Sequence, residues 1–139
     1  MVHPNEKSAS GASTYLIPDV GGDYLVGEHF TLSEFQCHDG TPVVLLHDAL
    51  VKHLDRMRRY FDSPVHVSSG FRTGAHNEAI GGVDDSVHLW GGAADIKIDG
   101  VQPSTVATYA EEEGFGGVGR YSTFTHVDVH GSGRRWDER

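Results

Sequence analysis

The chain has 139 residues, which is enough for one compact domain and too few for several. Its formal net charge of −9 disfavours nucleic acid and anionic membrane surfaces as partners. No apolar run approaches the roughly 18 residues of a membrane-spanning helix, and residues 1–13 lack the apolar centre of a signal peptide. We therefore predict a protein that is made in the cytoplasm and does not bind membranes.

The N-terminal segment, residues 1–22, is rich in Ser, Gly and Pro. This composition predicts a flexible arm ahead of a single domain over residues 23–139. Within that domain, Thr31-Leu32-Ser33-Glu34 has the pattern of a capping box. We therefore expect a short helix to begin near Leu32.

A longer helix is predicted over residues 43–61, because apolar residues recur there at steps of three and four. These residues are Leu46, Leu50, Leu54, Met57 and Phe61. The remaining predicted elements are a strand at 65–68, helices at 73–80 and 104–113, and two final strands at 116–121 and 125–130.

The stretch from Ala93, Ala-Ala-Asp-Ile-Lys-Ile, alternates in a way that predicts a strand with one core face. Because successive side chains alternate across a strand, the second, fourth and sixth residues share the apolar face, and Asp95 points from the other. Gly91 and Gly92 let the chain bend tightly just before this strand. The side chains of His88 and Asp95 can therefore converge.

The segment His-Val-Asp-Val-His that begins at His126 alternates in the same way. Its two valines share one face, and His126, Asp128 and His130 share the other. His88, Asp95 and His126 thus form a candidate zinc site from separate segments. Three protein ligands leave the fourth tetrahedral position to water, which is the arrangement of catalytic zinc.

The predicted helices and strands do not alternate regularly, which favours an α+β fold. We expect a small, mainly antiparallel sheet with helices packed on one face and the zinc site on the other. No internal repeat or linker divides the chain.

The pattern Ser86-x-His88-x-x-Gly91-x-Ala93-x-Asp95, followed by a late histidine, resembles the M15-type zinc D-Ala-D-Ala carboxypeptidases and related peptidoglycan peptidases. Ser69-Gly70-Phe71-Arg72 is similar to a Ser-Gly-Tyr/Phe-Arg segment of that family. The resemblance covers about residues 30–136. It implies one zinc ion per chain, bound by His88, Asp95 and His126.

One position departs from the best-known branches of this family. There, an Asp or Glu three residues before the last zinc histidine acts as general base, and here that residue is Thr123. Asp128 is the nearest acid, and it is predicted either to take the proton from zinc-bound water or to hydrogen-bond a ligand imidazole. We favour the base role, with His130 as the alternative proton carrier.

Three further residues are predicted to contact the substrate. The resemblance implies that Arg72 stabilises the oxyanion or anchors a substrate carboxylate, and a surface ion pair is the alternative. Ser86 is expected to make a hydrogen bond near the site rather than act as nucleophile, because no base stands beside it in a triad-like pattern. Tyr121 is expected to line the groove, with a place in the core as the alternative.

The resemblance implies a zinc metallopeptidase that cuts the peptidoglycan stem peptide, as a D,D-carboxypeptidase or an endopeptidase. Without a signal peptide, such an enzyme fits a phage lysin released through a holin, or a tail component that the virion brings to the cell wall. Two alternatives are a non-catalytic zinc-binding module, like the signalling domain of hedgehog proteins, and a structural phage-tail protein with the same fold. The sequence indicates no oligomeric state.

Overall fold

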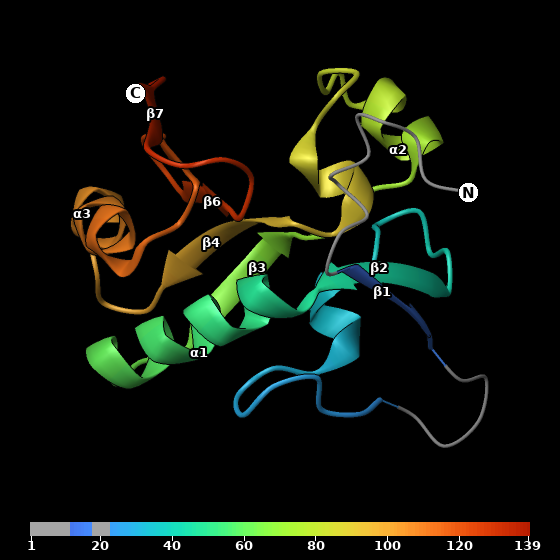
Figure 1. Cartoon of the computed structure of the whole chain (residues 1–139), viewed down its shortest axis with the longest axis horizontal. Coiled ribbons are helices and arrows are strands. Elements are labelled where there is room, and N and C mark those ends of the chain that lie inside the picture. The colour runs from blue at the N-terminus through green and yellow to red at the C-terminus, as the bar shows by residue number, and fades with distance from the viewer. Residues whose placement is uncertain (1–11, 18–22) are drawn as a thin grey trace.

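The computed structural model describes residues 12–17 and 23–139, and the statements below concern these residues. They form two β-sheets, three α-helices and two short 3-10 helices (Figure 1). The strands are β1 (Ala12–Leu16), β2 (Val43–His47), β3 (Val65–Ser69), β4 (Ala93–Ile98), β5 (Gly117–Arg120), β6 (Thr125–Asp128) and β7 (Arg134–Asp137). The helices are α1 (Asp48–Phe61), α2 (Gly74–Ala79), α3 (Pro103–Glu113) and the 3-10 helices η2 (Leu32–Phe35) and η3 (Val87–Trp90).

The larger sheet has the strand order β3-β4-β6-β5-β7. All its neighbouring strands are antiparallel except β5 and β7, which run parallel. A separate two-stranded sheet pairs β1 with β2. The α+β class and the mainly antiparallel sheet are therefore as predicted, and β7 adds a parallel edge strand.

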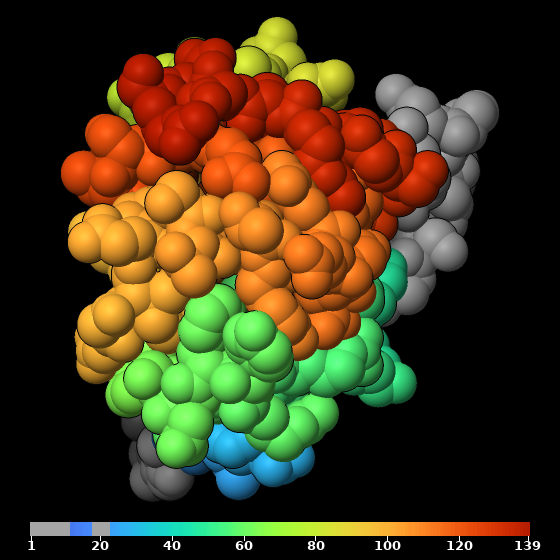
Figure 2. Space-filling model, turned by 90° about the vertical axis from the view of Figure 1, so that its left-hand side faces the viewer, coloured from blue at the N-terminus to red at the C-terminus, as the bar shows by residue number. Residues whose placement is uncertain are grey.

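Helices α1 and α3 cover one face of the larger sheet. Helix α3 packs on β4, β5 and β6, and α1 packs on β2, β3 and α3. The core between these layers includes Ile96 and Val127 from the strands and Leu54 and Val106 from the helices. Seen from the side, α3 and the C-terminal residues lie above α1 on the surface of the molecule (Figure 2). On the opposite face of the sheet, β4 and β6 present the side chains that alternate with those in the core.

The start of the long helix was predicted wrongly. Residues 43–47 form strand β2, and α1 begins only at Asp48. Val44 and Leu46 are fully buried at a spacing of two, so Leu46 fits the period of a strand as well as that of a helix. The two consecutive valines also favour a strand, because β-branched side chains lose χ1 freedom in a helix. His47 then caps the helix, with its Nδ1 accepting a hydrogen bond from Ala49 N at 3.2 Å.

Part of the predicted flexible arm is also ordered. Residues 12–16 form β1, which pairs antiparallel with β2 from Ala12 opposite His47 to Leu16 opposite Val43. The run Thr14-Tyr15-Leu16 consists of residues that suit strands, and β2 offers it an edge to pair with. The rest of the predicted arm, residues 1–11 and 18–22, lies outside the described residues.

Other local predictions are confirmed. Glu34 Oε2 accepts from Thr31 N at 2.7 Å in the capping box, although the helix that follows is a single 3-10 turn. Helices α2 and α3 lie within one residue of their predicted bounds. Among the described residues, no helix is both long enough and apolar enough to cross a membrane.

The turn from η3 into β4 depends on Gly91. Its φ is +76°, and a Cβ placed there would lie 2.0 Å from the carbonyl oxygen of Leu45. Only glycine combines this left-handed backbone with such close approach to β2. The amide of His47 donates back to the Gly91 carbonyl at 2.9 Å, which fixes η3 against the smaller sheet.

Candidate metal centre

Strand pairing brings the first two candidate ligands together. Asp95 on β4 lies directly opposite His126 on β6, and such pairs project to the same side of a sheet. Their neighbours Ala94 and Val127 are in the core, so Asp95 and His126 point to the other face. His126 Nδ1 lies 3.0 Å from Asp95 Oδ1.

His88 comes to this pair from helix η3. The hydroxyl of Ser86 caps that helix by accepting from His88 N at 3.2 Å. His88 is 2% exposed, and its Nε2 lies 3.4 Å from Asp95 Oδ1. Its Nδ1 lies 2.7 Å from the carbonyl oxygen of Gly70, which can only accept, so Nδ1 carries the hydrogen. The lone pair of Nε2 is therefore directed at the site.

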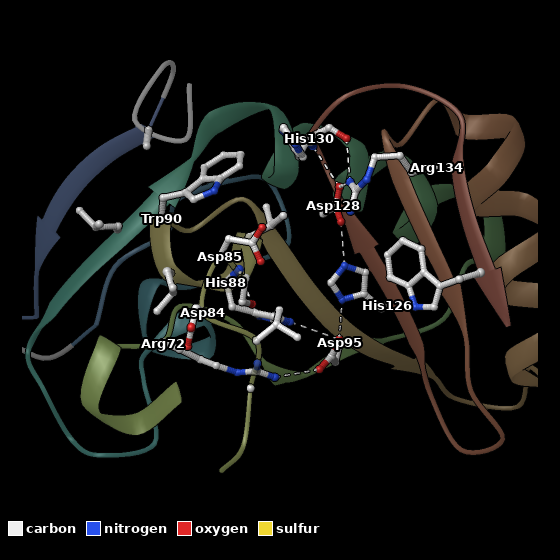
Figure 3. A pocket seen from close by; sticks show the side chains of 18 of the residues that line it. Arg72, Asp84, Asp85, His88, Trp90, Asp95, His126, Asp128, His130 and Arg134 are labelled. Carbon is white, nitrogen blue, oxygen red and sulfur yellow. Dashed lines mark hydrogen bonds and ion pairs between the residues drawn. The ribbon is translucent and has the colours of Figure 1, made fainter. Parts of the chain in front are cut away.

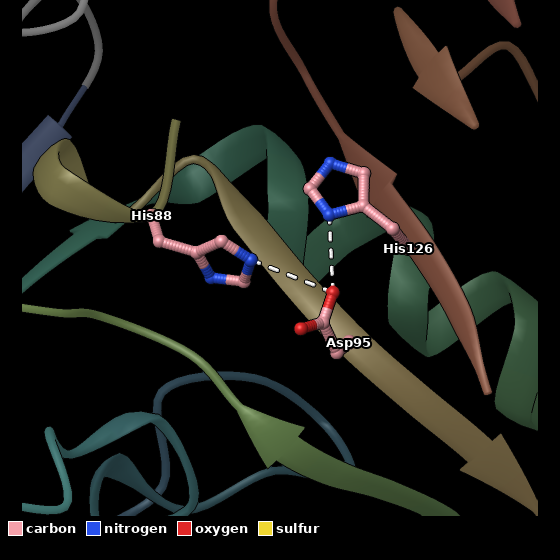
Figure 4. A group of neighbouring side chains, drawn as sticks. All are labelled: His88, Asp95 and His126. Carbon is pink, nitrogen blue, oxygen red and sulfur yellow. Dashed lines mark hydrogen bonds and ion pairs between the residues drawn. The ribbon is translucent and has the colours of Figure 1, made fainter. Parts of the chain in front are cut away.

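The three ligand atoms fit a zinc ion. They all lie within 4.8 Å of one another (Figure 4). With bonds of about 2.0–2.1 Å, the edge of a tetrahedron around zinc would be about 3.3–3.4 Å. The 3.4 and 3.0 Å separations of His88 Nε2 and His126 Nδ1 from Asp95 Oδ1 are close to that edge. Two imidazoles and one carboxylate are also a donor set that zinc prefers.

Asp128 contacts the His126 ring at Nε2, the nitrogen that does not face Asp95. Its Oδ2 lies 2.8 Å from His126 Nε2, and its Oδ1 accepts from His130 N at 3.0 Å and from Arg134 Nη1 at 2.8 Å. The residue is completely buried. Both carboxylate oxygens are thus engaged, and the contact with His126 is the carboxylate–histidine arrangement that orients metal ligands.

The pKa values of Asp95, His126 and Asp128 depend on one another, because these side chains are in contact. Burial alone would raise the pKa of Asp95, but the neighbouring imidazoles of His126 and His88 outweigh it and hold that pKa well below its ordinary value. Burial would likewise raise the pKa of Asp128, and its hydrogen bond from His126 lowers it. Burial would lower the pKa of His126, yet the flanking carboxylates Asp128 and Asp95 raise it. Without a metal, His126 therefore keeps its second ring proton to a higher pH than an ordinary histidine does.

Arg72 borders the same group. Its Nη2 lies 3.4 Å from Asp95 Oδ2, its Nη1 3.3 Å from Asn77 Oδ1, and its Nε 3.1 Å from Ser69 Oγ. These contacts hold the guanidinium plane beside Asp95 at the edge of a cleft (Figure 3).

The cleft has a volume of about 1060 Å³ and includes the three candidate ligands. Tyr121 lines it, stacked on Phe124 with ring centroids 4.4 Å apart. Ser86 lines it as well, but its hydroxyl already serves as the cap of η3. Thr123, at the position of the usual acid, is exposed in the β5–β6 turn and is not part of the cleft lining.

Among the residues of the cleft that sequence reasoning missed are Arg134 and Trp136 on β7. The ring of Trp136 lies 5.0 Å from that of His126, and its Nε1 donates to Tyr121 Oη at 3.1 Å. Arg134 and Trp136 are two residues apart, so both lie on the same face of a strand, and this spacing can be seen in the sequence Arg-Arg-Trp-Asp. The spacing indicates a place in the cleft only when β7 is known to lie beside β5.

Comparison with known proteins adds one finding. The model of the Peptidase M15 family matches residues 28–128, which include the three candidate ligands, Arg72 and Asp128. No curated protein matches the chain.

Proposed function

The chain belongs to the Peptidase M15 family, and from this premise we propose that it is a zinc-dependent peptidase that cuts the stem peptide of peptidoglycan. One observation carries the proposal: His88, Asp95 and His126 converge at a large cleft, and the outer nitrogen of each imidazole is held by an oxygen acceptor. This is how proteins prepare histidines to bind a metal. The match to the family supports peptide hydrolysis, and the resemblance of the Ser86–Asp95 pattern supports a D-amino acid substrate.

Each residue of the site has a proposed role. His88 Nε2, the Asp95 carboxylate and His126 Nδ1 would hold one zinc ion, which when bound polarises a carbonyl and lowers the pKa of a bound water toward about 7. Arg72 presents its guanidinium beside the ligands, where it stabilises a developing oxyanion or anchors a substrate carboxylate. Ser86 positions His88 through the cap of η3, and Tyr121 contributes to the wall of the cleft.

For Asp128, the contacts favour orientation of His126 over the base role that the sequence predicts. A general base must accept a proton from water, but both Asp128 oxygens are engaged by His126, His130 N and Arg134, and the residue is fully buried. We therefore assign proton transfer to His130, whose side chain lines the cleft at the end of β6.

Replacing Asp128 by asparagine tests this assignment. We expect zinc affinity to fall by about 10–100-fold, because the amide binds His126 Nε2 less strongly than the carboxylate. Activity should recover, at least in part, when zinc is added in excess. His130→Gln should instead keep zinc affinity and lower turnover by about two to four orders of magnitude. Zinc affinity, measured by competition with a chromophoric chelator, and turnover at saturating zinc distinguish the two variants. A low turnover of Asp128→Asn with normal zinc affinity would instead identify Asp128 as the base.

The raised pKa of His126 predicts opposite pH dependences with and without zinc. In the metal-free protein, the proton on His126 stabilises the fold below the unfolded pKa of about 6.5, and this contribution is lost as pH rises through the higher folded pKa. Zinc must displace that proton, so its affinity rises over the same interval. Melting temperatures measured from pH 6 to 9 should therefore fall for chelated protein, while the stabilisation by zinc grows. Parallel pH profiles for the two forms would contradict the assignment of His126 as a ligand.

A zinc-binding module without catalysis is the second candidate. It is favoured by Thr123, because the position of the usual acid is exposed and away from the cleft. We prefer the enzyme because Arg72 and His130 line the cleft along with the ligands. A phage lysin or a tail component remains the proposed setting, with action at the cell wall after release or delivery by the virion.

Hydrolysis of purified peptidoglycan is the test. Zinc-loaded protein should release either terminal D-Ala, as a carboxypeptidase, or cross-linked fragments, as an endopeptidase. Chelator should abolish the reaction and added zinc should restore it. Zinc binding at one ion per chain without any peptide product would identify the non-catalytic module.

A further inference from the structure

The edge strand β7 lies two strands away from the third metal ligand, yet its side chains touch that ligand and its support. The register of the sheet explains how. Gly117 on β5 pairs with Asp128 on β6 and with Arg134 on β7. Gly119 likewise pairs with His126 on one side and with Trp136 on the other. Two rows therefore run across three strands, each with a glycine in the middle.

The glycines leave the space in which the outer residues of each row meet. A Cβ at Gly117 would lie 2.4 Å from Asp128 Oδ2 and 2.7 Å from Arg134 Nη1. A Cβ at Gly119 would lie 2.4 Å from Trp136 Nε1. Any larger residue at Gly117 would therefore separate the Arg134 guanidinium from the Asp128 carboxylate.

The Arg134 side chain lies in this space and forms hydrogen bonds with residues at the end of β6. Its Nη1 donates to Asp128 Oδ1 at 2.8 Å and to the carbonyl oxygen of His130 at 2.9 Å. The guanidinium carbon lies 5.4 Å from the centroid of the Trp136 ring, within the range of a cation–π contact. Trp136 in turn packs on His126. Arg134 thus reaches His126 by two routes, through Asp128 and through Trp136.

We propose that Arg134 is a positioning residue of the metal site, which holds Asp128 across Gly117 so that Asp128 fixes the His126 ring with Nδ1 toward the metal. This inference rests on one part of the proposed function, the binding of zinc, and does not require peptidase activity. It assigns to β7, at the far edge of the sheet, a part in metal affinity.

The test compares Arg134→Met with Arg135→Met. Arg135 is the neighbour on the opposite face of β7, where its Nη1 donates to the carbonyl oxygens of Phe115 and Arg134. Arg134→Met should weaken zinc binding by about 10-fold or more, as expected for loss of a group that supports a ligand. It should also change the visible absorption of the Co²⁺-substituted protein. Arg135→Met should leave both unchanged, whatever its melting temperature, and Arg134→Lys should restore part of the zinc affinity.

A second variant keeps Arg134 and closes the gap. Gly117→Ala should weaken zinc binding as well, because the new methyl group displaces the buried Asp128 carboxylate. Gly74→Ala is its control, since a Cβ there meets nothing within 4 Å. Wild-type zinc affinity in Arg134→Met or Gly117→Ala, or equal losses in Arg134→Met and Arg135→Met, would overturn the inference. These binding measurements need no substrate, so absence of peptidase activity would count against the proposed function alone.

Discussion

Replacing His88 by alanine is expected to abolish zinc binding and all peptide hydrolysis. His88 is almost completely buried, and its hydrogen bond to the Gly70 carbonyl already fixes the tautomer that presents Nε2. The two remaining candidate ligands, Asp95 and His126, would leave half of the tetrahedral positions without a protein donor. The variant should also lose the stabilisation that zinc gives the wild type by mass action, about 4 kcal/mol at a zinc concentration 1,000 times the Kd.

Metal analysis and thermal unfolding, each with and without zinc, check this expectation. His66→Ala is the matched control, because His66 is an exposed histidine on β3 that pairs with Asp99 and does not line the cleft. It should bind one zinc ion per chain and respond to zinc as the wild type does. A His88→Ala protein that retains its zinc and melts with the zinc-loaded wild type would show that His88 is a buried core histidine.

Replacing Arg72 by lysine should lower activity by about one to three orders of magnitude with zinc content unchanged. Three different nitrogens of the guanidinium contact Asp95, Asn77 and Ser69. A lysine ammonium keeps the charge, but it cannot satisfy this planar set or bind an oxyanion bidentately. Asp95 keeps both histidine neighbours in the variant, so the ligand set remains in place.

Arg120→Lys is the control for Arg72→Lys. Arg120 also makes several side-chain hydrogen bonds, to Ser104 O, Thr108 and Glu111, but it does not line the cleft. Its replacement should leave kcat and KM unchanged. Full activity in Arg72→Lys at wild-type zinc content would reduce Arg72 to an ion pair with Asp95.

The central part of the site could be predicted because it depends on local alternation. A period of two around Asp95 and around His126 determines which side chains leave the core, and Gly91 permits the bend that brings His88 to them. The boundary of α1 could not be predicted in this way. Leu46 satisfies the periods of both a strand and a helix, and its pairing with β1 makes it part of a strand.

The surroundings of His126 depend on contacts between distant segments, which no local pattern reveals. The spacing of two between His126 and Asp128 is compatible with either a base or a support for the imidazole. The structure shows which His126 nitrogen faces Asp95 and which faces Asp128. The roles proposed for Arg134 and Gly117 depend on the parallel pairing of β7 with β5.

Anomalous diffraction at the zinc absorption edge, from crystals of the zinc-loaded protein, tests the central claim most directly. The account predicts one strong peak per chain, about 2.0–2.1 Å from His88 Nε2, from an Asp95 carboxylate oxygen and from His126 Nδ1. Asp128 should remain hydrogen-bonded to His126 Nε2 and should not approach the metal. A zinc ion bound elsewhere, or bound by Asp128 in place of Asp95, would contradict the account.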